Sequence, residues 1–132
     1  MRSKLDHMSI MVSDLNKSKK FYQGFLAILG YKIDFEEDWG ISFSNGEASI
    51  ILEETEKKYQ DIPYHRKRTG VNHIAFKVDS KEDVDQFNKA FLKKQGLQTL
   101  YETPKAFPEY SENYYAVFFE DPDRIKLEVL FY

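Results

Sequence analysis

The stretch Gly70-Val71-Asn72-His73-Ile74-Ala75-Phe76-Lys77-Val78 repeats in outline the earlier stretch Leu5-Asp6-His7-Met8-Ser9-Ile10-Met11-Val12. An offset of 66 residues aligns His73 with His7 and Val78 with Val12. The same offset aligns Phe87 with Phe21, Phe91 with Phe25, Leu92 with Leu26 and Gly96 with Gly30. A repeat at one fixed offset predicts that the chain is a single structural module used twice.

The composition is that of a folded protein without disulfides. The chain has 132 residues, of which 42% are hydrophobic, and a formal net charge of -3. It can bury a core, and because charges of both signs are interspersed we expect no nucleic-acid partner. No stretch approaches the roughly 20 apolar residues of a membrane helix, and no signal-peptide core follows Met1. We therefore expect a soluble, cytoplasmic protein without a membrane partner. Since cysteine is absent, only His, Asp and Glu side chains are left to hold a metal ion.

The first module predicts a strand, a helix and three further strands. Apolar residues alternate with His7, Ser9 and Met11 between Leu5 and Val12, as in a strand with one face on the core. Ser13 or Asp14 can cap a helix whose apolar positions recur at helical spacing until Gly30. Strand-like runs follow at 31–35, 40–44 and 48–54.

The second module repeats this order. A strand over 71–78 precedes Ser80, which can cap a helix with Asp83 three residues later, and Gly96 closes that helix. Further strands fit 99–102, 114–119 and 125–131, with a longer loop over 103–113 that could cover a cavity. The sequence thus predicts an α+β chain of two tandem βαβββ modules. Module one covers 5–54, a linker covers 55–69 and module two covers 70–132, all within one domain of residues 1–132.

Each module places a histidine in its first strand and a glutamate in its last. Ile50-Ile51-Leu52-Glu53 resembles Ile125-Lys126-Leu127-Glu128, and in both the Leu is expected on the core face and the Glu on the other. If the modules pair about a pseudo-twofold axis, His7, Glu53, His73 and Glu128 can converge. Imidazole and carboxylate ligands suit divalent Zn, Ni, Mn, Fe or Co and leave positions open for water or substrate.

In its order of motifs the chain resembles the vicinal oxygen chelate superfamily, which includes glyoxalase I, fosfomycin resistance proteins, extradiol dioxygenases and bleomycin-binding proteins. The motifs are LDHMSIMVSDLNKSKKFY, FLAILGY, GVNHIAFKVDS and YYAVFFEDPDRIKLEVL, which together span nearly the whole chain. The resemblance implies a curved mixed sheet around a cavity, a divalent metal ion and a homodimer.

Carried over by position, the metal ligands of the family fall on His7, His73 and Glu128. A fourth ligand, as in glyoxalases, falls on Glu53 if the two Leu-Glu pairs are aligned, which is the alignment we prefer. An alignment that starts from Ala48 places Ile51 there instead and leaves three protein ligands.

Two positions depart from the family pattern. Arg124 follows Asp121-Pro122-Asp123, where a glycine is common and better suited to a left-handed turn. Met11 stands where glyoxalase I proteins carry an arginine for glutathione, so the resemblance gives little support to glutathione as cosubstrate.

The resemblance favours a metal-dependent, glyoxalase-like enzyme whose small substrate chelates the ion through adjacent oxygens. Glu53 or Glu128 would then also be the candidate catalytic base. A thiol transferase or a dioxygenase could use the same ligands. The alternative from another class is a binding protein, like the bleomycin-binding relatives, with a cleft that depends on Tyr, Phe and Trp39.

Other candidate positions carry less information. Tyr114, Phe118, Lys126 and Tyr132 share an alternation that would turn them to the cavity side, where they could contact substrate. The basic run His65-Arg66-Lys67-Arg68 fits a solvated linker or, alternatively, a clamp for a phosphate or carboxylate.

Overall fold

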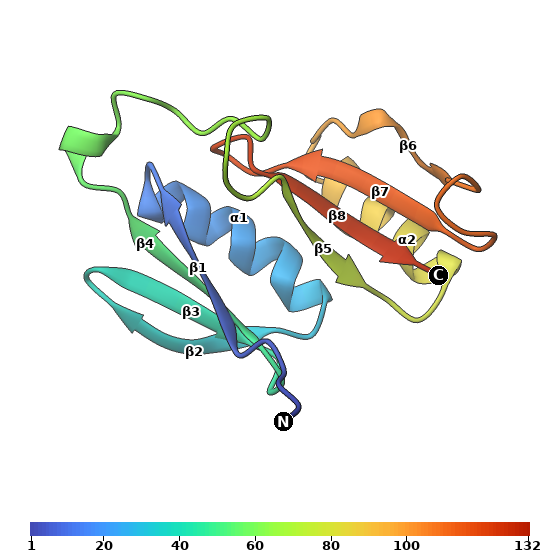
Figure 1. The fold of residues 1–132 in the computed structure, drawn as a ribbon, viewed down its shortest axis with the longest axis horizontal. Coiled ribbons are helices and arrows are strands. Elements are labelled where there is room, and N and C mark those ends of the chain that lie inside the picture. The colour runs from blue at the N-terminus through green and yellow to red at the C-terminus, as the bar shows by residue number, and fades with distance from the viewer. The chain divides into compact units, whose positions relative to one another are not determined.

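The computed structural model describes residues 1–132 as two compact units, Met1–Pro63 and Tyr64–Tyr132 (Figure 1). The predicted linker is divided between them, because the boundary lies after Pro63. None of the helices combines the length and the hydropathy that a membrane span requires.

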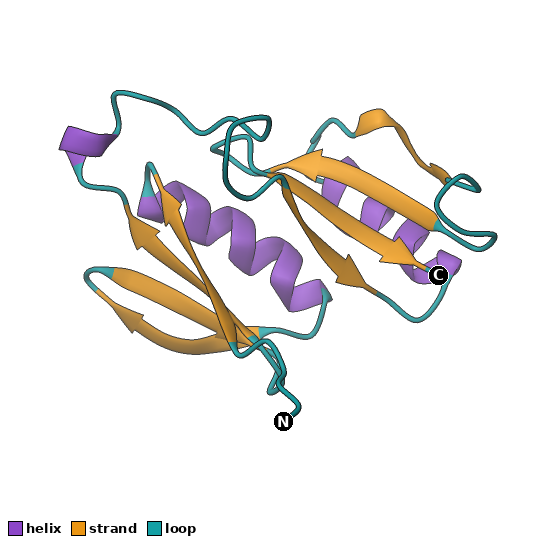
Figure 2. Cartoon of the chain, in the orientation of Figure 1, coloured by secondary structure: helices purple, strands orange, loops and turns teal.

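The first unit has the predicted βαβββ order, followed by a short 3-10 helix (Figure 2). Its elements are β1 (His7–Val12), α1 (Leu15–Ile28), β2 (Lys32–Glu37), β3 (Gly40–Ser44), β4 (Ser49–Glu54) and η1 (Lys57–Tyr59). The strand order β1-β4-β3-β2 makes the first and last strands parallel neighbours. Asp14 is the helix cap, since its carboxylate accepts a hydrogen bond from the backbone N–H of Lys17 at 2.9 Å.

The second unit repeats this topology. Its elements are β5 (His73–Lys77), α2 (Lys81–Phe87), the π-helical turn η2 (Asn88–Lys93), β6 (Leu100–Ala106), β7 (Tyr115–Glu120) and β8 (Lys126–Phe131). The strand order is β5-β8-β7-β6, again with a parallel pair of first and last strands. The α+β class and the tandem modules are therefore confirmed.

Each sheet buries one face against its own helices. Val12, Leu52 and Leu26 in the first unit and Val129, Phe119 and Leu92 in the second are completely or almost completely buried. The strand residues among them, Val12, Leu52, Val129 and Phe119, alternate along the strands with the candidate functional residues, which consequently lie on the opposite face.

Strand β6 differs from its prediction, because it extends through Thr103 to Ala106, where the sequence predicted a loop. Tyr101 and Glu102 both adopt positive φ angles, 58° and 57°, and shift the register against β7. Thr103 Oγ1 bridges the interruption, accepting from the Phe118 backbone N–H at 3.0 Å and donating to the Leu100 carbonyl at 2.7 Å. Because a bulge of this kind interrupts the alternation of inward and outward side chains, the continuation of the strand could not be predicted from the sequence pattern.

The turn between β7 and β8 keeps its predicted position and places Arg124 in the left-handed region, at φ 67°. The Asp121 carboxylate stabilises the turn by accepting from the backbone N–H groups of Asp123 and Ile125, at 2.9 and 2.8 Å. The turn thus forms without glycine, at a conformational cost carried by Arg124.

This geometry predicts that Arg124→Gly stabilises the protein by about 1 kcal/mol, because glycine adopts the left-handed conformation without steric penalty. The ion pair lost with Arg124 is a 3.5 Å contact from a side chain that is 74% exposed, and such pairs contribute little. Thermal unfolding of both proteins measures the difference. Gly46→Ala is the reciprocal control, since Gly46 has φ 88° and open space around it, and should lose stability. A destabilised Arg124→Gly variant would contradict this account.

Candidate functional site

The parallel pairing of β5 with β8 brings His73 and Glu128 together on the face opposite α2. Glu128 lies directly across from Ala75, so His73 is its diagonal neighbour. His73 Nε2 is 3.3 Å from Glu128 Oε2, with the His73 side chain 38% exposed and the Glu128 side chain only 1% exposed. A buried carboxyl beside a partly exposed imidazole is therefore the centre of the candidate site.

The orientation of the His73 ring is set by the residue before it. Asn72 donates its Nδ2–H to the Arg66 carbonyl at 2.8 Å, which leaves Asn72 Oδ1 facing His73 Nδ1 at 2.9 Å. His73 Nδ1 must then carry the hydrogen, and in a neutral ring Nε2 presents a lone pair toward Glu128. When Glu128 is ionised, two acceptor atoms therefore face each other, an arrangement that a proton or a metal cation between them would stabilise.

The electrostatics of the pair favour the neutral forms. Burial, and then the positive charge of Lys126, lower the pKa of His73. Burial raises the pKa of Glu128, although the Tyr114 hydrogen bond and Lys126 act in the opposite direction. Neutral imidazole is the form that binds metal ions, and a bound cation would compensate the desolvated carboxylate. The donor set in the second unit therefore fits a divalent metal.

Tyr114 holds the other oxygen of the carboxyl, donating its hydroxyl hydrogen to Glu128 Oε1 at 2.7 Å. Burial, followed by this hydrogen bond to Glu128, raises the pKa of Tyr114, so the phenol stays protonated. Its ring stacks on Tyr132 at a centroid distance of 5.6 Å. Tyr114 thus fixes the orientation of Glu128.

The predicted contact residues lie on this same face of the second unit. Phe118 is paired directly with Glu128, and Lys126 places its Nζ 5.3 Å from the centre of the Phe118 ring. An apolar cluster lies on this face as well. It consists of Phe107, Ala116, Phe118 and Leu130, with Leu100 and Tyr114 packed against it. The prediction that these side chains share the face of Glu128 is consistent with the strand pairing, while their contact with a substrate stays a prediction.

The first unit places His7 and Glu53 on the corresponding face without bringing them into contact. His7 is paired with Ser49, and Glu53 is paired with Met11 at the other end of the strands. The Glu53 carboxylate accepts a hydrogen bond from Ser9, which lies between the two on β1. His7 Nδ1 is 2.8 Å from an Asp6 carboxylate oxygen, so its Nε2 is also left as the ring atom available to a metal.

The strand registers bear on the fourth ligand position. In the second unit, Ala75 comes two residues after His73 and is paired with Glu128. In the first unit, Ser9 comes two residues after His7 and is paired with Ile51. The Leu-Glu alignment is therefore offset by two residues, and Ile51 is the structural counterpart of Glu128. Glu53 as a ligand stays a prediction, but its alignment with Glu128 does not hold in the structure.

Asp6 and Asn72 are residues that the sequence reasoning missed. Each directly precedes a candidate histidine and places a side-chain oxygen on its Nδ1. Metal-binding histidines commonly donate their second ring N–H to such a partner. The signal was present as an Asp or Asn before each histidine of the repeat. No group of three or more His, Asp or Glu side chains that could hold a metal ion gathers within either unit.

The Glyoxalase/Bleomycin resistance protein/Dioxygenase superfamily model matches residues 4–129. The chain belongs to this superfamily. The curated relative YqjT from Bacillus subtilis (strain 168) is 37% identical over 126 residues, covering 96% of this chain and 97% of that protein, and its name states no activity.

Two solved structures illustrate the similarity within the superfamily. A glyoxalase-like protein from Bacillus halodurans is 39% identical, with a TM-score of 0.88 over 97% of this chain and 95% of that one. The fosfomycin resistance protein FosX from Listeria monocytogenes shares the fold, with 24% identity, a TM-score of 0.71, and coverage of 100% and 95%. Family membership supports a glyoxalase-type fold and leaves the reaction to be argued from the residues.

The raised pKa of Glu128 predicts that Glu128→Gln stabilises the metal-free protein at neutral and higher pH. Ionisation of this carboxyl is less favourable in the folded than in the unfolded chain, so stability is lost as the pH rises through its folded pKa. Glutamine keeps an oxygen that can accept from Tyr114 but removes the charge.

Thermal unfolding in a chelating buffer should show a higher midpoint for Glu128→Gln at about pH 8. The difference should vanish near pH 4, where both side chains are neutral. Tyr114→Phe serves as the comparison, because it removes the hydrogen bond and leaves the carboxyl in place. A Glu128→Gln variant that is less stable than the parent at about pH 8 would refute the assignment.

Proposed function

We propose that the protein is a metal-dependent, glyoxalase-like enzyme acting on a small substrate that chelates a divalent ion through adjacent oxygens. The observation that carries this proposal is the 3.3 Å contact between His73 Nε2 and the buried carboxyl of Glu128, with the Asn72 amide oxygen on the other ring nitrogen of His73. The superfamily match supports the choice of reaction type.

The proposed ligands are His7 from the first unit with His73 and Glu128 from the second, and Glu53 is the predicted fourth. The two groups of ligands would have to meet in one chain or between two copies, in keeping with our expectation of a homodimer. Bound there, a divalent ion would act as a Lewis acid on the chelated oxygens.

Other side chains of this chain orient the proposed ligands and shape their surroundings. Asn72 keeps the His73 ring in one tautomer, and Tyr114 keeps the Glu128 carboxyl in one orientation. The apolar cluster around Phe118 limits water beside the pair, which strengthens electrostatic interactions there. Lys126 offers a positive charge to an oxyanion that forms on the substrate.

A catalytic base is available in the carboxylates. Glu53 has its carboxylate held by Ser9 on the exposed face of the first unit. If three protein residues hold the metal, Glu53 is left to remove a proton adjacent to a substrate carbonyl. Glu128 is the other candidate, with its raised pKa bringing it nearer to the working pH of a base.

The second candidate is a protein that binds a small aromatic or cationic compound without turnover. The apolar cluster with Phe107 and Phe118 favours it, because aromatic edges and faces already contact one another there at a centroid distance of 5.5 Å. Trp39 gives this proposal less support, since it is 54% exposed and contacts Phe35 at the β2–β3 turn of the first unit.

Protein purified without a chelating step should contain about one divalent ion per chain, and the His73→Ala variant should contain none. Elemental analysis of both measures this. Zinc, nickel, manganese or cobalt would agree with glyoxalase or transferase chemistry, and redox-active iron would favour a dioxygenase. His65→Ala is the matched control, because His65 lies outside the proposed ligands. Absence of metal from the parent, even after ions are added back, would leave the binding-protein function.

If His7, His73 and Glu128 alone hold the ion, Glu53→Gln should retain the metal and lose turnover, because Glu53 then acts as the base. The register, in which Ile51 and not Glu53 is the counterpart of Glu128, supports this alternative. We expect a decrease in kcat of about 100-fold or more, the usual contribution of a general base. Metal content and activity are measured on the same preparation. Loss of the ion from Glu53→Gln, to the same degree as from His73→Ala, would instead identify Glu53 as a ligand.

A further inference from the structure

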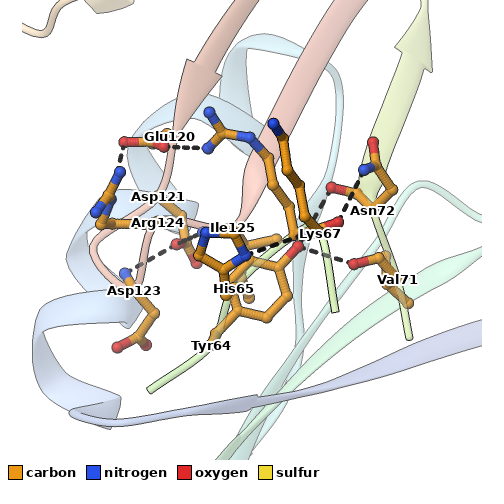
Figure 3. A network of polar contacts seen from close by, with 11 residues as sticks. Tyr64, His65, Lys67, Val71, Asn72, Glu120, Asp121, Asp123, Arg124 and Ile125 are labelled. Atoms are coloured by element: carbon orange, nitrogen blue, oxygen red, sulfur yellow. Dashed lines mark hydrogen bonds and ion pairs between the residues drawn. The ribbon is translucent and has the colours of Figure 1, made fainter. Parts of the chain in front are cut away.

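The second unit contains a pocket of about 230 Å³ that none of the proposed metal ligands lines. Its lining residues are Tyr64, His65, Arg66, Lys67 and Arg124. They come from the segment before β5 and from the turn between β7 and β8 (Figure 3). Every lining side chain carries a positive charge or a ring N–H or hydroxyl group, and no carboxylate is among them.

A single carboxylate holds two guanidinium groups at this pocket. Glu120 Oε1 is hydrogen-bonded to Arg66 Nη1, and Glu120 Oε2 is 3.5 Å from Arg124 Nε. Each guanidinium has five N–H groups, so these contacts leave donors on both. The hydrogen bond to Glu120 raises the pKa of Arg66, which therefore remains cationic. Lys67 adds a third positive charge, while the nearby Asp121 carboxylate is engaged by backbone N–H groups.

The segment that carries Arg66 is held in place by its own hydrogen bonds. Asn72 Nδ2 donates to the Arg66 carbonyl at 2.8 Å, and the Tyr64 hydroxyl donates to the Val71 carbonyl at the same distance. His65 Nδ1 accepts from the Lys67 backbone N–H at 3.2 Å, which leaves the hydrogen of a neutral ring on Nε2 as a donor. A preformed set of donors loses little conformational freedom when a ligand binds.

The backbone of Arg124 gives a second line of evidence. A left-handed φ of 67° is strained for any residue with a Cβ, and the exposed contact with Glu120 offsets little of that strain. Glycine would fill the turn more favourably, yet the turn presents a guanidinium at the pocket instead. Strain of this sort is often found where a side chain has a function.

We propose that this pocket binds an oxyanion, the phosphate or carboxylate group of a small molecule. Guanidinium groups match the geometry of both oxyanions through paired hydrogen bonds, and Lys67 adds charge. This goes beyond the proposed function, since it requires no metal.

The position of the pocket relates it to the candidate site. Glu120 is paired with Lys126, and Lys126 is paired with His73, so the three lie in one row across β7, β8 and β5. Two strand spacings separate Glu120 from His73, or about 10 Å. A small molecule with its oxyanion in the pocket could extend along this row toward His73, with Lys126 midway.

The test is a titration of the full-length, isotope-labelled protein, followed by NMR in a chelating buffer at constant ionic strength. The probes are phenyl phosphate and benzoate, which share a ring and differ in the oxyanion. We expect saturable shifts of the backbone amides of 64–68 and 121–125 with at least one probe. The probe that binds more tightly shows whether the pocket prefers a phosphate or a carboxylate group. The chelating buffer removes metal ions that could otherwise bind the probe. The result therefore does not depend on whether the proposed metal site exists.

Arg124→Gly and Lys67→Met should each weaken binding by about 10-fold or more, the loss expected for one charge-assisted contact. Because Arg124→Gly is expected to be more stable than the parent, weaker binding in that variant cannot be due to unfolding. Lys94→Met removes one exposed positive charge away from the pocket and should bind like the parent. The proposal is overturned if neither probe gives saturable shifts, or if all three variants bind alike.

Discussion

The parallel pairing of the first and last strands in each unit is the contact on which the remaining structure depends. A parallel pair cannot be joined by a tight hairpin, so the intervening chain must cross over, and here it forms the helix and the two middle strands. The helix covers one face of each sheet, which leaves the other face to the residues that alternate with the core. The register of that pair then decides which polar side chains become neighbours. In the second unit it makes His73 and Glu128 diagonal neighbours.

The buried carboxyl of Glu128 gives this pairing its chemical consequence. A carboxylate that is 1% exposed loses most of its hydration, and the one hydroxyl donated by Tyr114 replaces only part of it. The nearest imidazole cannot compensate, because Asn72 fixes the hydrogen on Nδ1 and turns a lone pair toward the carboxyl. The pair is therefore satisfied by a proton or by a cation placed between the two atoms. The same features would destabilise the metal-free protein as the carboxyl ionises.

The sequence predicted those parts of the structure that depend on alternation and repetition. His7, His73 and Glu128 could be assigned to the faces away from the helices because their apolar neighbours alternate along the strands. Glu53 shows the limit of this reasoning. A similar Leu-Glu pair suggested equivalence with Glu128, but hydrogen-bonding register depends on tertiary pairing, and it made Ile51 the counterpart. The bulge at Tyr101 and Glu102 was equally hidden, since two left-handed residues without glycine leave no recognisable pattern.

The two units share a topology, but their exposed faces carry different chemistry. Residues at the same register position are Ile51 in the first unit and Glu128 in the second, so only one unit has a carboxyl buried beside its histidine. The second unit also carries the apolar cluster around Phe118 and the pocket lined by Arg66 and Arg124, both of which contact Glu120. The first unit carries His7 at the start of β1 and, separately, the Glu53 carboxylate hydrogen-bonded to Ser9. A duplicated module therefore need not give a symmetric site. Here the repeat preserves a histidine with its Nδ1 partner in both units. The buried carboxyl, the apolar cluster and the pocket lined by Arg66 and Arg124 occur in the second unit.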